Sequence, residues 1–103
     1  IVLPEVMRYW LPARQSRLAK VAELLGVPVT RKMPEAEAAE ASIEAVKDLR
    51  KSVALPTCLR EVGGQSDDVD ELAESAISLG RLLELSPVAA TLGDARAILN
   101  ACL

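Results

Sequence analysis

The chain has 103 residues, a formal net charge of −3, a pI near 4.9 and no histidine. With 50% hydrophobic and 26% charged residues it has the composition and length of one globular domain. An acidic chain whose only aromatic residues are Tyr9 and Trp10 lacks both the basic face and the stacking groups that nucleic acid requires, so we expect no nucleic-acid partner.

The first predicted helix covers residues 3–10, and we expect its true start to lie upstream, because Pro4 suits only a first turn or a kink. Pro12 predicts a boundary. After it, apolar residues three and four positions apart predict a second helix that ends at Gly26. Its apolar stripe is Leu18, Val21, Ala22 and Leu25.

Residues 27–33 are predicted to form a connection, and Pro34 is expected to be the first residue of a helix that runs to about Ser52. Acidic residues gather at its start and basic residues at its end, an order that suits the helix macrodipole. The glutamates would suit a cation site, but a solvated helix face is the better interpretation because no ligand set converges. The predicted apolar stripe is Ala36, Ala39, Ile43, Val46, Leu49 and Val53.

A short helical turn is predicted at residues 58–62. Residues 63–64, two glycines, are interpreted as a helix stop, because neither a GxGxxG nor a Walker spacing supports a phosphate loop. Ser66 is the expected cap of a helix that runs to about Leu83, and the proline of residues 86–87 closes it. Its predicted buried stripe is Val69, Leu72, Ala73, Ala76 and Ile77.

Thr91 is the predicted cap of the last helix, with Asp94 three residues on, as in a capping box. The predicted buried face of that helix is Ala95, Ile98, Leu99 and Cys102. Short connections place successive helices side by side. The expected fold class is therefore all-α: an antiparallel helical bundle of about five helices, forming a single domain over residues 1–103.

The two cysteines, Cys58 and Cys102, form neither a disulfide framework nor a zinc site and are expected to be buried, reduced thiols. No apolar run is long enough to span a bilayer, and residues 1–6 lack the features of a signal peptide, so a cytoplasmic protein without a membrane partner is expected. The carboxylates sit at polar helix starts, where pKa values fall rather than rise. We therefore assign no catalytic, cofactor-binding or metal-binding residue to this chain.

Six segments, in this order and spacing, resemble the C-terminal region of the iron-containing (group III) alcohol dehydrogenases. They are IVLPxVMRY (1–9), RLAxVAxxLG (17–26), AVxxL (45–49), LPTxLxEVG (55–63), DxDELA (68–73) and RLL through Pro to DARAI (81–98). No single segment is specific, but six in register cover nearly the whole chain. The fold implied is that of the C-terminal part of a dehydroquinate synthase-like enzyme.

This resemblance implies a two-domain enzyme in which an N-terminal Rossmann-like domain binds NAD or NADP and a helical domain holds a divalent metal, iron or possibly zinc. The family's metal ligands, one Asp and three His, precede the segment that matches Leu3 and Pro4, so none of them falls on this chain. The metal acts as a Lewis acid on the alcohol oxygen during hydride transfer. The implied partners are the N-terminal domain and further copies of the protein.

The chain departs from the family at three places. Glu5 stands where members usually carry His, Trp10 where they commonly carry Asn, and residues 85–88 where many read Asn-Asn-Pro-Arg. The last departure makes a polar loop apolar and leaves the subfamily open. The surrounding segment, Leu82 to Val88, is the best candidate to approach the catalytic cleft.

Two alternatives to a truncated alcohol dehydrogenase stay open. One is a free-standing helical module that binds other proteins, and the other is the same domain from a maleylacetate reductase, a glycerol dehydrogenase or a dehydroquinate synthase-like enzyme. The chain alone is expected to be inactive. Exposed apolar residues at its start, including Val2, Leu3, Val6 and Trp10, are expected to favour self-association.

Overall fold

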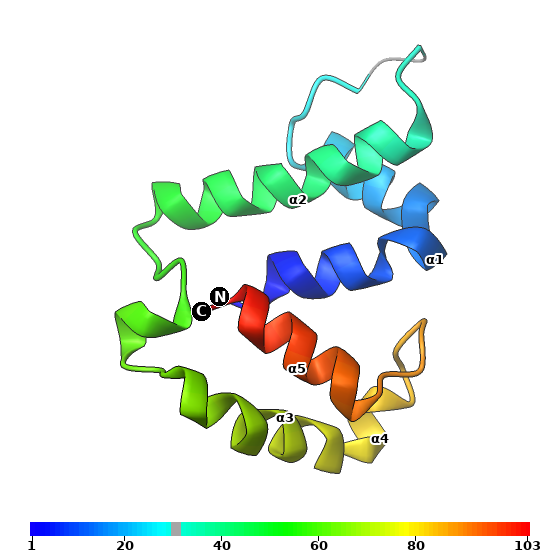
Figure 1. Ribbon diagram of the computed structural model, residues 1–103. Coiled ribbons are helices and arrows are strands. Elements are labelled where there is room, and N and C mark those ends of the chain that lie inside the picture. The colour runs from blue at the N-terminus through cyan, green and yellow to red at the C-terminus, as the bar shows by residue number, and fades with distance from the viewer. Residues whose placement is uncertain (30–31) are drawn as a thin grey trace.

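The computed structural model describes residues 1–29 and 32–103, and in these ranges every regular element is helical. The elements are α1 (Leu3–Leu24), α2 (Glu35–Ser52), α3 (Val69–Ser78), α4 (Gly80–Leu83), α5 (Leu92–Ala101) and two 3₁₀ turns, Leu59–Val62 and Ser66–Asp68. The first half of α1 lies between α2 and α5, and α5 lies between α1 and α3, with neighbours running in opposite directions (Figure 1). The expected all-α fold of about five helices is confirmed.

The molecule is flat and open. It measures 44 × 31 × 18 Å, and its radius of gyration is 14.8 Å, where a compact chain of this length has about 13 Å. Its accessible surface is 6836 Å², against roughly 5,600 Å² for a compact monomer of this mass. The helices therefore leave much apolar side-chain surface uncovered.

Within the described ranges, no helix has the length and apolar character needed to cross a membrane.

The main core lies between α1 and α2. Met7, Leu18, Ala39 and Ile43 are all at most 6% exposed, and Leu11, Val21 and Val46 pack around them. Away from this core, Val69 and Ala73 of α3 and Cys102 at the end of α5 are also buried. Burial of such side chains stabilises the fold by roughly 25 cal/mol per Å² of apolar surface.

The boundary predicted at Pro12 is present but lies two residues later. Pro12 is inside α1, and the break comes at Arg14, which leaves helical geometry with φ −139° and ψ 30°. Pro12 has no N–H to donate to the preceding turn, which weakens the helix on its N-terminal side, whereas the break at Arg14 lies on its C-terminal side. Met7 before the kink and Leu18 after it both pack on α2, and this burial keeps the two halves together.

Helix α2 begins at Glu35, one residue later than predicted. Pro34 is the cap, with extended backbone (ψ 141°), and its carbonyl accepts the first helical hydrogen bond, from the Ala38 N–H at 3.1 Å. The predicted connection before it, residues 27–33, includes positions 30 and 31, which lie outside the described residues. The ordering of charges along α2 is as expected, with Glu35 in the first turn and Arg50 in the last.

The predicted apolar stripe of α2 is only partly correct. Ala39 and Ile43 are buried as expected, whereas Leu49 and Val53 are 52% and 58% exposed. The face that α1 covers is centred on the first half of α2 and includes Ser42, whose hydroxyl donates to the Ala39 carbonyl at 2.6 Å. The apolar residues of α2 therefore keep their helical spacing beyond the part of α2 that α1 covers.

The single helix predicted from Ser66 to about Leu83 is three elements. It begins as a 3₁₀ turn, continues as α3 and breaks at Leu79 (φ −80°, ψ 40°) before the one-turn helix α4. The following Gly80 weakens helix propagation at this point. Ser66 is not the cap: the N–H of Gln65 donates to Asp68 Oδ2 at 2.8 Å instead.

Candidate functional site

An apolar hollow lies between the first half of α1, the end of α3, α4 and α5. It has a volume of about 310 Å³ and an almost entirely apolar wall. Its lining residues are Val2, Val6, Tyr9, Trp10, Ala76, Ile77, Leu82, Leu83, Leu85, Ser86, Ala90, Ala95, Ile98 and Leu99. The segment singled out by sequence, Leu82 to Val88, thus supplies part of this wall.

Trp10 on α1 is hydrogen-bonded to the loop after α4. Its indole Nε1 donates to Ser86 Oγ at 3.2 Å, and the Ser86 hydroxyl donates to the Val88 carbonyl at 2.6 Å. The polar edge of the indole is therefore paired within the chain, while its rings line the hollow. Trp10 and the apolar loop at residues 85–88 meet at this contact.

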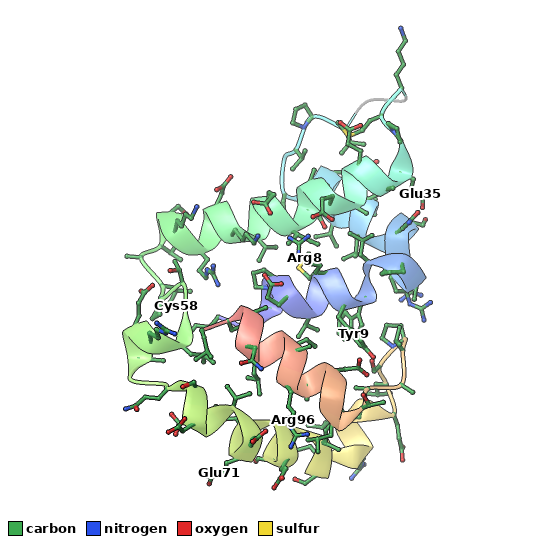
Figure 2. The ribbon with its side chains drawn as sticks, viewed as in Figure 1. Arg8, Tyr9, Glu35, Cys58, Glu71 and Arg96 are labelled. Atoms are coloured by element: carbon green, nitrogen blue, oxygen red, sulfur yellow. The ribbon has the colours of Figure 1, made fainter. Side chains whose placement is uncertain are left out.

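Tyr9 on α1 contacts the segment between α4 and α5, and the start of α5, by further hydrogen bonds. Its hydroxyl lies 3.1 Å from the Ala89 carbonyl and 3.2 Å from Asp94 Oδ2. Partial burial and then the charge of Asp94 raise the pKa of the Tyr9 hydroxyl. Figure 2 shows Tyr9 on the side of α1 that faces α5.

Thr91 and Asp94 form the capping box that the sequence predicts at the start of α5. The Thr91 N–H donates to Asp94 Oδ2 at 2.8 Å, and the Asp94 N–H donates to Thr91 Oγ1 at 3.2 Å. The hydrogen bond from the Thr91 N–H, followed by that from the Thr91 hydroxyl, lowers the pKa of the Asp94 carboxyl. The box holds the acceptor to which Tyr9 donates.

The hollow is suited to binding apolar groups, because its wall is almost entirely apolar. The donor groups of Tyr9, Trp10 and Ser86 are all engaged with other groups of the chain. No nucleophile stands beside a base along its wall. It can hold hydrocarbon groups.

Two glutamates of α2, Glu40 and Glu44, are engaged in ion pairs. Arg8 reaches across from α1 to Glu40 and Glu44, and it also pairs with Glu5 on its own helix (Figure 2). The hydrogen bond to Glu40 raises the pKa of the Arg8 guanidinium, and the nearby ammonium of Lys47 lowers the pKa of Glu44. This arrangement supports a solvated, paired helix face rather than a cation site.

All 103 residues match a family model described as the Fe-containing alcohol dehydrogenase family, C-terminal. The chain belongs to this family. It is 38% identical over 77 residues to lactaldehyde reductase of Escherichia coli strain K12, covering 75% of this chain and 20% of that protein. It is 35% identical over 80 residues to 1,3-propanediol dehydrogenase of Klebsiella pneumoniae, covering 78% and 20%.

A third relative is the NAD-dependent methanol dehydrogenase of Bacillus methanolicus, 35% identical over 74 residues, which are 72% of this chain and 19% of that protein. The matched part of the chain therefore spans about a fifth of the length of these relatives. The resemblance found in the six segments is confirmed, as is the chain's place as a C-terminal domain of the iron-containing alcohol dehydrogenase family.

The family's metal does not fit on the described part of this iron-containing alcohol dehydrogenase domain. The chain has no histidine, and residues 1–29 and 32–103 contain no group of three or more Cys, Asp or Glu side chains that would hold a metal ion. That this chain contributes no catalytic, cofactor-binding or metal-binding residue stays a prediction. The approach of residues Leu82 to Val88 to the catalytic cleft also stays a prediction.

Sequence reasoning missed the two aromatic contacts that close one side of the hollow. Tyr9 and Trp10 are adjacent in the chain and are its only aromatic residues. This rarity is the sequence signal that sets them apart, but it does not indicate their partners. Their partners Ser86 and Asp94 lie far away in the sequence, and no spacing rule connects them. Only the packing of α5 against α1 brings these pairs together.

Proposed function

We propose that this chain is the C-terminal helical domain of a metal-dependent alcohol dehydrogenase that interconverts a small alcohol and its aldehyde or ketone with NAD or NADP. The observation that supports the proposal most directly is the family match over residues 1–103. The named relatives act as a lactaldehyde reductase, a 1,3-propanediol dehydrogenase and an NAD-dependent methanol dehydrogenase. NAD rather than NADP is the first cofactor to test because one relative's name specifies it.

Within such an enzyme residues 1–103 form one helical unit that serves by packing. The remainder of the polypeptide supplies the nucleotide-binding domain and the ligands of a divalent metal, iron or zinc. A bound metal contributes Lewis acidity toward the alcohol oxygen. The chain's own contribution is one wall of the hollow: Trp10 and Tyr9 hold the 84–91 connection against α1, and Leu82 and Leu83 line the hollow beside it.

The open surface supports the further proposal that this domain is covered by the N-terminal domain and by other copies in a homo-oligomer. Several large apolar side chains are more than half exposed, as expected where another domain or subunit covers them. They are Leu3, Leu24, Leu49, Val53, Leu55, Val62, Leu79, Leu82 and Leu85. Both cysteines are free thiols, which suits the reducing cytoplasm in which we place the enzyme.

The test uses the full-length protein that contains residues 1–103. It is purified without metal, reloaded with ferrous iron, and assayed for NADH oxidation with lactaldehyde and for NAD or NADP reduction with 1,3-propanediol and methanol. Turnover with at least one substrate that depends on the added metal is expected, and residues 1–103 alone should give none. Absence of turnover in a folded, metal-loaded full-length protein with every substrate and both cofactors would contradict the proposal.

A further inference from the structure

The only two cysteines of the chain lie at one junction of the fold. The N–H of Leu59, the residue after Cys58, donates to the carbonyl of Cys102 itself at 2.7 Å. With standard bond lengths on either side of this hydrogen bond, the Cα atoms of Cys58 and Cys102 lie at most about 7.5 Å apart, and the bend at the amide nitrogen and at the carbonyl oxygen makes the separation shorter. Figure 1 shows the C-terminus beside the segment that follows α2, where Cys58 lies.

This separation is compatible with a disulfide. Bridged cysteines usually have Cα atoms 4.4 to 6.8 Å apart, and only a separation beyond about 7 Å excludes a bond without backbone movement. The backbone on both sides is also held in place: Leu59 is bonded to Cys102, and the N–H of Cys102 donates to the Leu99 carbonyl at 3.0 Å. The two cysteines are thus kept near each other in the reduced protein.

The two thiols differ in their surroundings. Cys58 is partly exposed, and its thiol donates to Glu61 Oε1 at 3.7 Å (Figure 2). Cys102 is only 4% exposed, and its burial raises the pKa of its thiol. An oxidant in solution therefore reaches Cys58 first, and Cys102 is sheltered from everything except its neighbours.

We propose that Cys58 and Cys102 form a reversible intramolecular disulfide when the protein meets hydrogen peroxide. The Cys58 thiolate attacks one peroxide oxygen, so that an S–O bond forms, the O–O bond breaks and one water is released. Cys58 then turns from Glu61, and the Cys102 thiolate attacks its sulfur, forming the S–S bond and releasing the second water. Overall two thiols lose two protons and two electrons, and peroxide is reduced to two waters.

The bond would join the end of α5 to the start of the 59–62 turn. It would enclose the whole second half of the chain, including α3, α4 and the α5 side of the apolar hollow, in one covalent loop. A bridge over a long loop restricts the unfolded chain and so favours the folded state. Oxidation would therefore raise the melting midpoint, and reduction would restore the original value.

The experiment treats the full-length protein at low concentration with hydrogen peroxide, alkylates the remaining thiols and digests with trypsin without reduction. The expected product is the peptide 52–60 joined to the peptide that begins at Ala97, lighter than their sum by two hydrogen atoms and separated by dithiothreitol. The melting midpoint should rise by several degrees in the same sample. Recovery of Cys58 only as sulfinic or sulfonic acid, or only as a link between two molecules, would overturn the proposal.

The matched controls separate geometry from general reactivity. C58S and C102S should each lose the linked peptide and the shift in melting midpoint, while their reduced forms keep the wild-type circular dichroism spectrum. The double variant C58S/V62C moves the thiol to the other end of the same short turn, at an exposed position. It should give no linked peptide. Equal linkage in C58S/V62C would show that the pairing does not depend on the contact between Leu59 and Cys102, and would also reject the proposal.

Discussion

Trp10 Nε1 donates to Ser86 Oγ at 3.2 Å and thereby joins the first helix to the loop between α4 and α5. The two residues are 76 positions apart in the sequence. The Ser86 hydroxyl continues the chain of hydrogen bonds to the Val88 carbonyl. Because Trp10 is the chain's only tryptophan, the integrity of this contact can be followed by fluorescence in residues 1–103.

Replacing Trp10 by Phe and Ser86 by Ala tests this contact. Each change removes one partner of a partly buried hydrogen bond, and a neutral bond of this kind contributes about 1 kcal/mol. In urea unfolding, the double variant should be more stable than the sum of the two single losses by about 0.5 to 1.5 kcal/mol. Strict additivity of W10F and S86A would show that the two side chains do not interact.

The capping box gives a second prediction. T91A removes the hydroxyl that accepts the Asp94 N–H at the start of α5, and the loss of such a cap costs about 1 kcal/mol of unfolding free energy. S78A is the matched control. Ser78 is exposed at the C-terminal end of α3, and its hydroxyl donates to the Ser75 carbonyl of the same helix at 2.6 Å. The measurement is chemical denaturation, and an equal loss in S78A would contradict a specific capping role.

The same box predicts a pH dependence. The pKa of Asp94 is lowered in the folded state, first by the Thr91 N–H and then by the Thr91 hydroxyl. Its contribution to stability is therefore complete above the unfolded pKa, about 3.9, and is lost as the pH falls through the lower folded value. Unfolding measured from pH 6 downward should show D94N less stable than wild type at pH 6, with the difference shrinking in acid. A difference that is constant with pH would contradict this assignment.

The capping box was predictable because all of its information is local. Thr91 and Asp94 stand at the required spacing, and their two reciprocal hydrogen bonds form within four residues of the chain. The turn at Gly63 was predictable for a similar reason, since its φ of +89° favours glycine. Periodicity likewise placed Ile43 and Leu18 in the core.

The errors occur where a distant surface decides. Leu49 and Val53 continue the apolar period of α2 but lie beyond the face that α1 covers. The break predicted at Pro12 is displaced to Arg14, where the helix kinks, and Met7 before it and Leu18 after it are buried in the same core. The hollow required α1, α3, α4 and α5 at once, and no pattern in one segment describes such an arrangement.

Arg8 supports a prediction about ionic strength. Its guanidinium pairs with Glu5 at 3.5 Å, with Glu44 at 3.8 Å and with Glu40, but its side chain is 43% exposed. Exposed pairs typically contribute 0.2 to 1 kcal/mol each and are screened by salt. R8Q should lower the free energy of unfolding by about 1 kcal/mol in dilute buffer and by clearly less in 1 M NaCl. A loss that does not change with salt would show that Arg8 acts by packing alone.

Ile43 gives the largest predicted loss, because it is fully buried between the two halves of α1. I43A leaves a cavity where Met7 and Leu18 meet, and truncations of this kind cost about 2 to 5 kcal/mol. L49A removes a comparable hydrocarbon group from the same helix, but Leu49 is 52% exposed, so in residues 1–103 its loss should be within about 0.5 kcal/mol. If L49A becomes costly only in the full-length protein, the exposed half of α2 is covered there by another domain or subunit. Equal losses for both variants in residues 1–103 would contradict the packing of α1 on α2 described above.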